Sequence, residues 1–109
     1  MNNFNEIDIM TTTIQETDER LIATLSGELD TAAAKETEKA LAPLLDSKGK
    51  DIMIDCTELE YISSSGLRVL LAILKQAKSV GSRVVLKNVN EVIRDVLELT
   101  GFISLFEFE

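Results

Sequence analysis

The feature that most constrains this fold is the alternation of short apolar runs with longer segments of helical periodicity. The apolar runs are too short for helices and indicate strands; they lie at residues 9–14, 20–26, 51–55, 83–87 and 102–108. Segments with apolar residues at helical spacing lie at residues 33–45, 67–80 and 88–100. The resulting order is β-β-α-β-α-β-α-β. It predicts an α/β fold with a mixed β-sheet of about four to five strands packed against helices on one side.

Local signals predict where several elements end. Pro43 interrupts the first helical pattern, so we expect that helix to kink or end near residue 42. The polar stretch at residues 57–62 is expected to be a loop. Asn88 followed by Glu91 resembles a capping box at the start of the third helix, and Gly101 fits its end.

Length and charge limit the partners that this chain can bind. At 109 residues it has room for one core, so we expect a single domain over residues 1–109 with a loosely ordered start at residues 1–7. Acidic residues outnumber basic ones by 19 to 11, giving a formal net charge of −8. This field repels phosphates, so we expect no nucleic acid and no anionic membrane as partner. A partner that presents Lys and Arg would fit, although solubility alone also explains the charge.

The location follows from what the sequence does not contain. It has neither a signal-peptide pattern nor an apolar run of membrane length. We therefore expect a cytoplasmic protein without membrane insertion.

The residues that carry most enzyme chemistry are missing. The chain has no histidine, which removes the usual general base, the commonest zinc ligand and every Ser-His triad. Cys56 is the only cysteine and is expected to be a small buried hydrophobe. Asp30 and Asp55 could form a metal pair, but two separate carboxylates are more simply a helix cap and a strand-end charge. No phosphate-binding glycine loop occurs. We expect no catalytic residue, no metal site and no cofactor, and hence no enzyme.

Two polar segments follow predicted strands, at residues 27–30 and 55–65. Open α/β sheets place their sites just beyond the carboxyl ends of parallel strands. If these two strands are neighbours in the sheet, Glu28 and Asp30 share one rim with three consecutive serines.

The serines, Ser63, Ser64 and Ser65, stand with Gly66 directly before a strongly apolar helix. One serine can cap that helix while the others fill a turn. The same position would also tolerate a phosphate, because the helix dipole favours negative charge there by about 0.3–1 kcal/mol. Gly66 removes side-chain bulk and is expected to let another protein approach the backbone closely. Spacing alone leaves both interpretations open.

Several blocks resemble the signatures of STAS-domain anti-sigma-factor antagonists. They are LSGELD at 25–30, IDCT at 54–57, ISSSGL at 62–67 and VLELTGF at 96–102. The similarity covers roughly residues 9–108, and several blocks in the right order are far more specific than the serines alone. The family usually has Asp where this chain has Ser63.

The resemblance implies a partner switch. The unphosphorylated antagonist binds an anti-sigma factor that is also a serine kinase, and the sigma factor is released. The kinase phosphorylates the serine before the motif glycine, here Ser65, and a metal-dependent serine phosphatase resets the switch. ATP and magnesium belong to the kinase, so the antagonist itself needs no cofactor. Ser64 is a second candidate acceptor. The expected partner-binding residues are Glu28, Asp30, Ser63, Ser64, Gly66 and Arg68.

Arg68 follows Ser65 by one helical turn on the same face. We expect it to be exposed and to aid the kinase complex by steering or by pairing with a partner acid. A solvated helix charge is the simpler alternative.

Two other interpretations of the resemblance remain. In a constitutive STAS subunit of a lipid-transport ABC complex, the same helix face would be a permanent docking surface without phosphorylation. In a nucleotide-binding STAS module, a phosphate loop would be needed, and this chain lacks one. The Ser64-Ser65-Gly66 block favours the switch.

Overall fold

The structure, a computed structural model, describes residues 9–109. The loose start expected at residues 1–7 lies outside the described residues. The strands are β1 (Thr11–Glu16), β2 (Arg20–Leu29), β3 (Asp51–Ile62), β4 (Val84–Lys87) and β5 (Glu107–Phe108). The α-helices are α1 (Thr31–Ala40), α2 (Ser64–Ser79) and α3 (Glu91–Thr100), and the 3-10 helices are η2 (Ala42–Asp46) and η3 (Ile103–Leu105).

The strands form one mixed sheet in the order β1-β2-β3-β4-β5. β1 pairs antiparallel with β2, as a hairpin requires, whereas β2 through β5 run parallel to their neighbours. Each parallel connection passes through a helical segment, as crossovers between parallel strands do. The predicted α/β class, the element order and the mixed sheet are confirmed.

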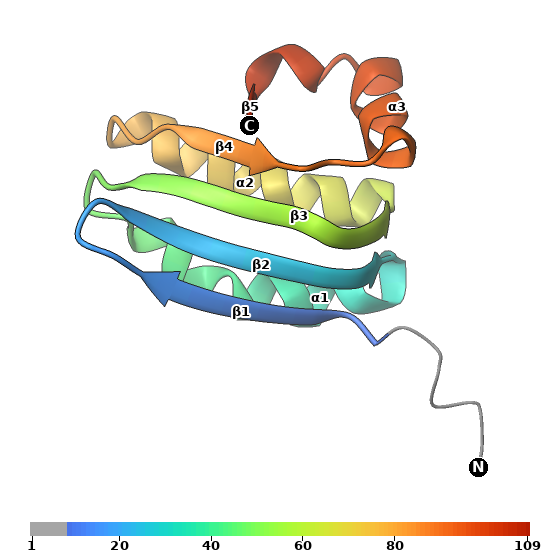
Figure 1. Ribbon diagram of the computed structural model, residues 1–109, viewed down its shortest axis with the longest axis horizontal. Coiled ribbons are helices and arrows are strands. Elements are labelled where there is room, and N and C mark those ends of the chain that lie inside the picture. Colours follow the sequence, from blue (N-terminus) through green and yellow to red (C-terminus); the bar gives the residue numbers. More distant parts are fainter. Residues whose placement is uncertain (1–8) are drawn as a thin grey trace.

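Two helices, α1 and α2, lie together on one face of the sheet (Figure 1). Side chains of β2 alternate strictly, so that Leu21, Ala23 and Leu25 are at most 6% exposed while the residues between them are half-buried. α2 supplies the apolar layer that meets this face, through Leu67, Leu70, Ile73, Leu74 and Ala77. The core therefore lies between the sheet and the pair of helices, and the N-terminus of α2 sits at its edge.

The C-terminal part of the chain closes the β4 side of the sheet (Figure 1). α3 contributes Ile93 and Leu97 to the core, at 1% and 0% exposure. Its N-cap residue Asn90 donates from Nδ2 to the carbonyl of Leu59 at 3.1 Å. This hydrogen bond joins the start of α3 to the second half of β3.

The prediction of a loop at residues 57–62 is wrong, because β3 continues to Ile62. β2 likewise runs to Leu29, past its expected end at residue 26, and the two strands stay paired through two shifts of register. Gly27 adopts a φ of 105° within this bulged stretch. The extra residues at both shifts lie in β3 and break its alternation of buried and exposed residues, so the second half of β3 has the sequence pattern of a loop.

The ends of α1 and α3 agree with the prediction, whereas the start of α3 does not. α1 ends at Ala40 and the chain continues as η2, which has Pro43 in its first turn, so the early end is confirmed. Gly101 ends α3 with a φ of 80°, also as predicted. Asn88 is not the cap of α3: it has a φ of 58°, and Asn90 two residues later accepts from the Ile93 N–H at 2.9 Å. Asn88 instead donates from its side chain to the hydroxyl of Thr57.

Between residues 9 and 109, every helix is too short or too polar to cross a membrane.

Candidate partner-binding site

The carboxyl ends of β2 and β3 meet at one rim of the sheet, as the topology argument predicted. The two strands are parallel neighbours, with Leu29 opposite Ile62. The backbone N–H of Ser63 donates to the carbonyl of Leu29 at 2.8 Å. The start of α1 and the start of α2 therefore stand side by side, and Asp30 and the serines share this rim.

Asp30 is a helix cap. It directly precedes α1, and its Oδ1 accepts from the backbone N–H of Ala33 at 2.8 Å. A carboxylate at this position satisfies one of the free N–H groups of the first turn and complements the helix dipole. Glu28 is exposed beside it. Asp30 thus has a structural task, while Glu28 is free to face a partner.

Ser63 has the same task for α2. Its Oγ accepts from the backbone N–H of Gly66 at 3.1 Å, and the residue is only 7% exposed. The interpretation of one serine as a cap is confirmed for Ser63. Because Asp and Ser are comparably good N-caps, a serine can replace the aspartate that the family usually has here. Ser63 was also predicted to contact a partner, but its oxygen is buried and already engaged.

Gly66 corrects the sequence-based expectation. It is buried within the first turn of α2, so it does not offer its backbone to an approaching protein. A Cβ at this position would lie 2.5 Å from Cγ of Leu29 and 2.8 Å from the Leu29 carbonyl oxygen. Both distances are far below van der Waals contact. The glycine is required because α2 packs tightly on the end of β2.

Ser64 and Ser65 occupy the outward side of the same turn. Ser64 is exposed and Ser65 is half-buried. Neither hydroxyl makes a hydrogen bond to another residue of the described chain. Arg68 is exposed one turn further along α2, as predicted. The accessible, unengaged hydroxyls are therefore those of Ser64 and Ser65, the two candidate acceptors.

Ser65 opens onto a groove between α1 and α2. The groove has a volume of about 510 Å³ and is lined by Thr31, Ala34, Lys35, Glu38, Ser65, Arg68, Val69 and Ala72. Its two cations come from different helices, and Lys35 was not singled out from the sequence. Thr31, Lys35 and Glu38 follow helical spacing, which identifies a common face of α1, but only the packing of α1 on α2 brings that face to Ser65.

Asp55 lies outside this rim. It pairs with Thr24 in the sheet, six residues before Asp30 along β2, a separation of about 20 Å for extended chain. Hydrogen bonds from the hydroxyl and N–H of Thr57 hold the pKa of the Asp55 carboxyl below its usual range. The geometry therefore excludes the Asp30–Asp55 metal pair. Residues 9–109 also contain no group of three or more Cys, His, Asp or Glu side chains arranged to hold a metal ion.

Cys56 is a buried hydrophobe, as predicted. It is 1% exposed, and burial raises the pKa of its thiol to about 12. Because the thiolate is the reactive form of cysteine, this side chain is unsuited to nucleophilic chemistry.

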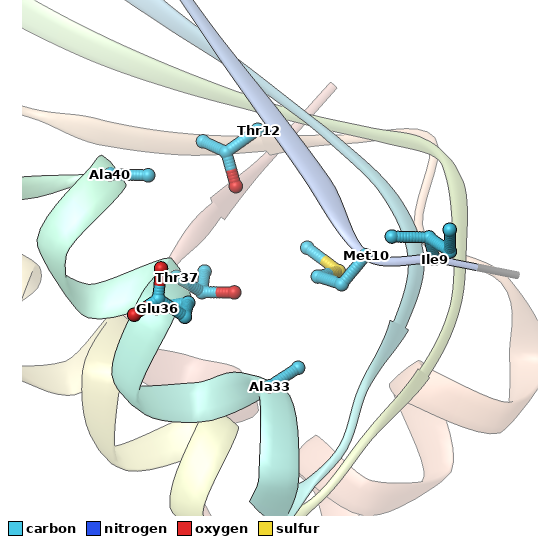
Figure 2. A pocket seen from close by; sticks show the side chains of 7 residues that line it. All are labelled: Ile9, Met10, Thr12, Ala33, Glu36, Thr37 and Ala40. Carbon is cyan, nitrogen blue, oxygen red and sulfur yellow. The ribbon is translucent and has the colours of Figure 1, made fainter.

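A second cavity, of about 370 Å³, lies between the start of β1 and α1. Figure 2 shows Met10 and Thr12 on one wall and Ala33 and Thr37 on the other. None of the predicted site residues lines it, and Glu36 is its single charged residue. This cavity is separate from the serine rim.

Comparison with known proteins agrees with the resemblance seen in the sequence. The STAS domain family model matches residues 9–109. The chain is 38% identical to the protein BtrV of Bordetella bronchiseptica, provisionally assigned as an anti-sigma factor antagonist, over 89% of this chain and 84% of that one. It is 28% identical to the anti-sigma-B factor antagonist of Bacillus subtilis, over 76% and 75% of the two chains.

Solved structures give the same result. An anti-sigma factor antagonist from Mycobacterium paratuberculosis superposes with a TM-score of 0.76 at 26% identity, covering 92% of this chain and 85% of that one. The unphosphorylated form of the antagonist SpoIIAA shares the fold, with a TM-score of 0.75 at 22% identity over 91% and 88% of the two chains. The chain therefore belongs to the STAS-domain family of anti-sigma-factor antagonists.

Proposed function

We propose that this chain is an anti-sigma-factor antagonist that works as a partner switch. Unphosphorylated, it binds an anti-sigma factor and so frees the sigma factor; phosphorylated on Ser65, it lets the anti-sigma factor go. The observation that carries the proposal is the free hydroxyl of Ser65 on the first turn of α2, beside a groove open to solvent. In this role the chain is a substrate and a ligand, not a catalyst, and it needs no cofactor of its own.

The partner is proposed to be an anti-sigma factor that is also a serine kinase, with a metal-dependent serine phosphatase as the resetting enzyme. Support comes from a relative of the same fold, SpoIIAA, whose structure is known in an unphosphorylated and a phosphorylated form. Support also comes from the chemistry of the rim, where Ser65 is the serine next to Gly66 and Ser64 is the other free hydroxyl. Glu28 and Arg68 are also exposed and would contact the partner.

Phosphorylation is proposed to block the interface without unfolding the domain. A phosphate carries about −1.5 to −2 charges at neutral pH, and at a helix N-terminus that charge is favourable or neutral for the fold. In a docked interface the same charge has to be desolvated or is repelled by partner acids, which costs several kcal/mol when it stays unpaired. A loss of about 4 kcal/mol weakens binding roughly a thousandfold.

The test uses four variants and the cognate anti-sigma factor with ATP. Ser65→Ala should remain bound in the presence of ATP, and Ser65→Asp should bind poorly while melting within a few degrees of wild type. Ser64→Ala and Ser64→Asp are the matched controls, since Ser64 is on the same turn and also makes no hydrogen bond. Mass spectrometry of protein from its native cells should place phosphate on Ser65.

The proposal fails if phosphorylated protein binds its kinase as tightly as before, or if it loses its cooperative melting transition. Tight binding in cells without any phosphate on either serine would instead favour a constitutive interaction subunit. Phosphate on Ser64 alone would move the acceptor by one residue and leave the switch in place.

A further inference from the structure

The groove beside Ser65 carries local charge of the opposite sign to the rest of the chain. The formal net charge of the protein is −8, yet the residues that line this groove include two cations, Lys35 and Arg68, and one acid, Glu38. Its floor is made of small apolar side chains, with Ala34 and Val69 each 8% exposed. The groove is thus a weakly positive strip over an apolar base.

Both cations lack an ion-pair partner. The ion pairs within residues 9–109 join Lys39 to Glu36, Lys50 to Glu16 and Arg83 to Glu107. Lys35 and Arg68 belong to none of them, although Glu38 shares their groove. Two free cations on facing helices are available to an anion placed between them.

We propose that a phosphate on Ser65 is held within the same molecule by Arg68 and Lys35, so that phosphorylation reverses the charge of the α1–α2 groove. This inference rests on the proposed function and names how the switch at Ser65 is read. The acceptor lies three residues before Arg68 on α2, a spacing at which side chains are neighbours. The guanidinium group binds phosphate oxygens in a bidentate manner, and the ammonium group of Lys35 approaches as a point charge from α1.

The consequence concerns what a partner meets in this groove. Before phosphorylation, two exposed cations can pair with carboxylates of the partner across the apolar floor. Afterwards a phosphate of about −2 charges occupies both cations and leaves the groove net negative. A partner acid that was attracted is then repelled, and the cations it used are already taken. The phosphate therefore acts by competition as well as by repulsion.

The contact can be measured without any kinase. Phosphoserine is introduced at position 65 during translation, and the second pKa of its phosphate, ordinarily about 6, is followed by ³¹P NMR. Since neighbouring cations favour the dianion, Arg68→Ala and Lys35→Ala should each raise that pKa by roughly 0.2–0.7, the range expected for exposed pairs. Salt at 1 M should remove most of the difference.

Lys39→Ala is the matched control, because Lys39 is an exposed cation on α1 that pairs with Glu36 and does not line the groove. It should leave the phosphate pKa unchanged. Equal pKa values in wild type, Arg68→Ala and Lys35→Ala would overturn the inference, as would an equal effect of Lys39→Ala. All variants are surface changes, and unchanged melting temperatures of the unphosphorylated proteins verify that they fold.

The two proposals can fail separately. If the titration shows the contact but protein from native cells never carries phosphate, the proposed contact is supported and the proposed partner switch is refuted. If the protein is phosphorylated in cells but the titration shows no effect of either cation, the proposed partner switch is supported and the proposed contact is refuted.

Discussion

Replacing Gly66 with alanine tests whether this glycine serves the packing of the domain or the approach of a partner. The added Cβ would meet Cγ of Leu29 at 2.5 Å, the Leu29 carbonyl oxygen at 2.8 Å and Cγ1 of Ile62 at 3.1 Å. The Leu29 side chain is fully buried in the core, and its carbonyl is held by the 2.8 Å hydrogen bond from Ser63 that joins the two elements. The first turn of α2 would therefore have to move away from β2.

The expected magnitude follows from two opposing effects. Overpacking of a core typically costs about 1–3 kcal/mol, and a fixed carbonyl puts this site at the upper end. Alanine returns up to about 1 kcal/mol of helix propensity. We expect Gly66→Ala to lower the free energy of unfolding by about 1–3 kcal/mol and the melting temperature by about 5–15 °C.

The assay is urea and thermal unfolding, with Ser64→Ala as the control from the same turn. Ser64 is exposed and makes no hydrogen bond, so its replacement should change stability by less than about 0.5 kcal/mol. Adding Leu29→Ala to Gly66→Ala should relieve part of the clash and give a favourable coupling of at least about 0.5 kcal/mol. If Gly66→Ala were as stable as wild type but failed to bind its partner, the packing argument would be wrong.

Two further predictions concern the cap of α2 and the buried thiol of β3. Ser63→Ala should lose about 0.5–2 kcal/mol of stability in urea unfolding, because the N–H of Gly66 loses its acceptor, whereas Ser63→Asp should stay within about 0.5 kcal/mol of wild type; equal losses for both would refute the cap. Cys56 should react with a thiol reagent at pH 8 at least roughly a hundredfold more slowly in the folded than in the unfolded protein, since burial raises its pKa to about 12. Because the folded state keeps this proton longer, stability should fall as the pH rises above the unfolded thiol pKa of about 8.5; rapid labelling of native protein would contradict both statements.

The architecture could be predicted because its signals are local. The strict alternation in β2 and the short apolar run that opens β3 each identify a strand from adjacent residues alone. Pro43 and Gly101 ended their helices as expected, because both act through their own backbone geometry. The second half of β3 could not be found in this way. β3 carries an extra residue at each of its two register shifts against β2, and adjacent Thr57 and Glu58 are both exposed, so the alternation that identifies a strand is lost.

In the site, too, features set by local sequence could be predicted, and features set by tertiary contacts could not. A cap before an apolar helix was evident from the three serines, but which serine caps depends on where α2 starts against Leu29. Position 66 requires glycine because it contacts β2, which is distant in sequence. No local sequence pattern indicates this contact. Lys35 could be predicted only in part. Its helical face can be read from the sequence, whereas its position opposite Ser65 follows only from how α1 packs on α2.

The way α2 is attached explains why a phosphate on Ser65 should act on the partner and not on the fold. The Ser63 N–H bonds to Leu29 O, the Ser63 hydroxyl bonds to the Gly66 N–H, and Gly66 lies directly against Leu29. Each hydrogen bond contributes about 0.5–1.5 kcal/mol net, and the burial of Leu29 contributes about 1.5–3 kcal/mol. A phosphate at this helix N-terminus interacts with the helix dipole by only about 0.3–1 kcal/mol, and in the stabilising direction. An effect of that size and sign cannot detach α2 from β2, so phosphorylation of Ser65 leaves the fold around it intact. A partner can therefore detect phosphorylation only through the reversal of charge in the groove.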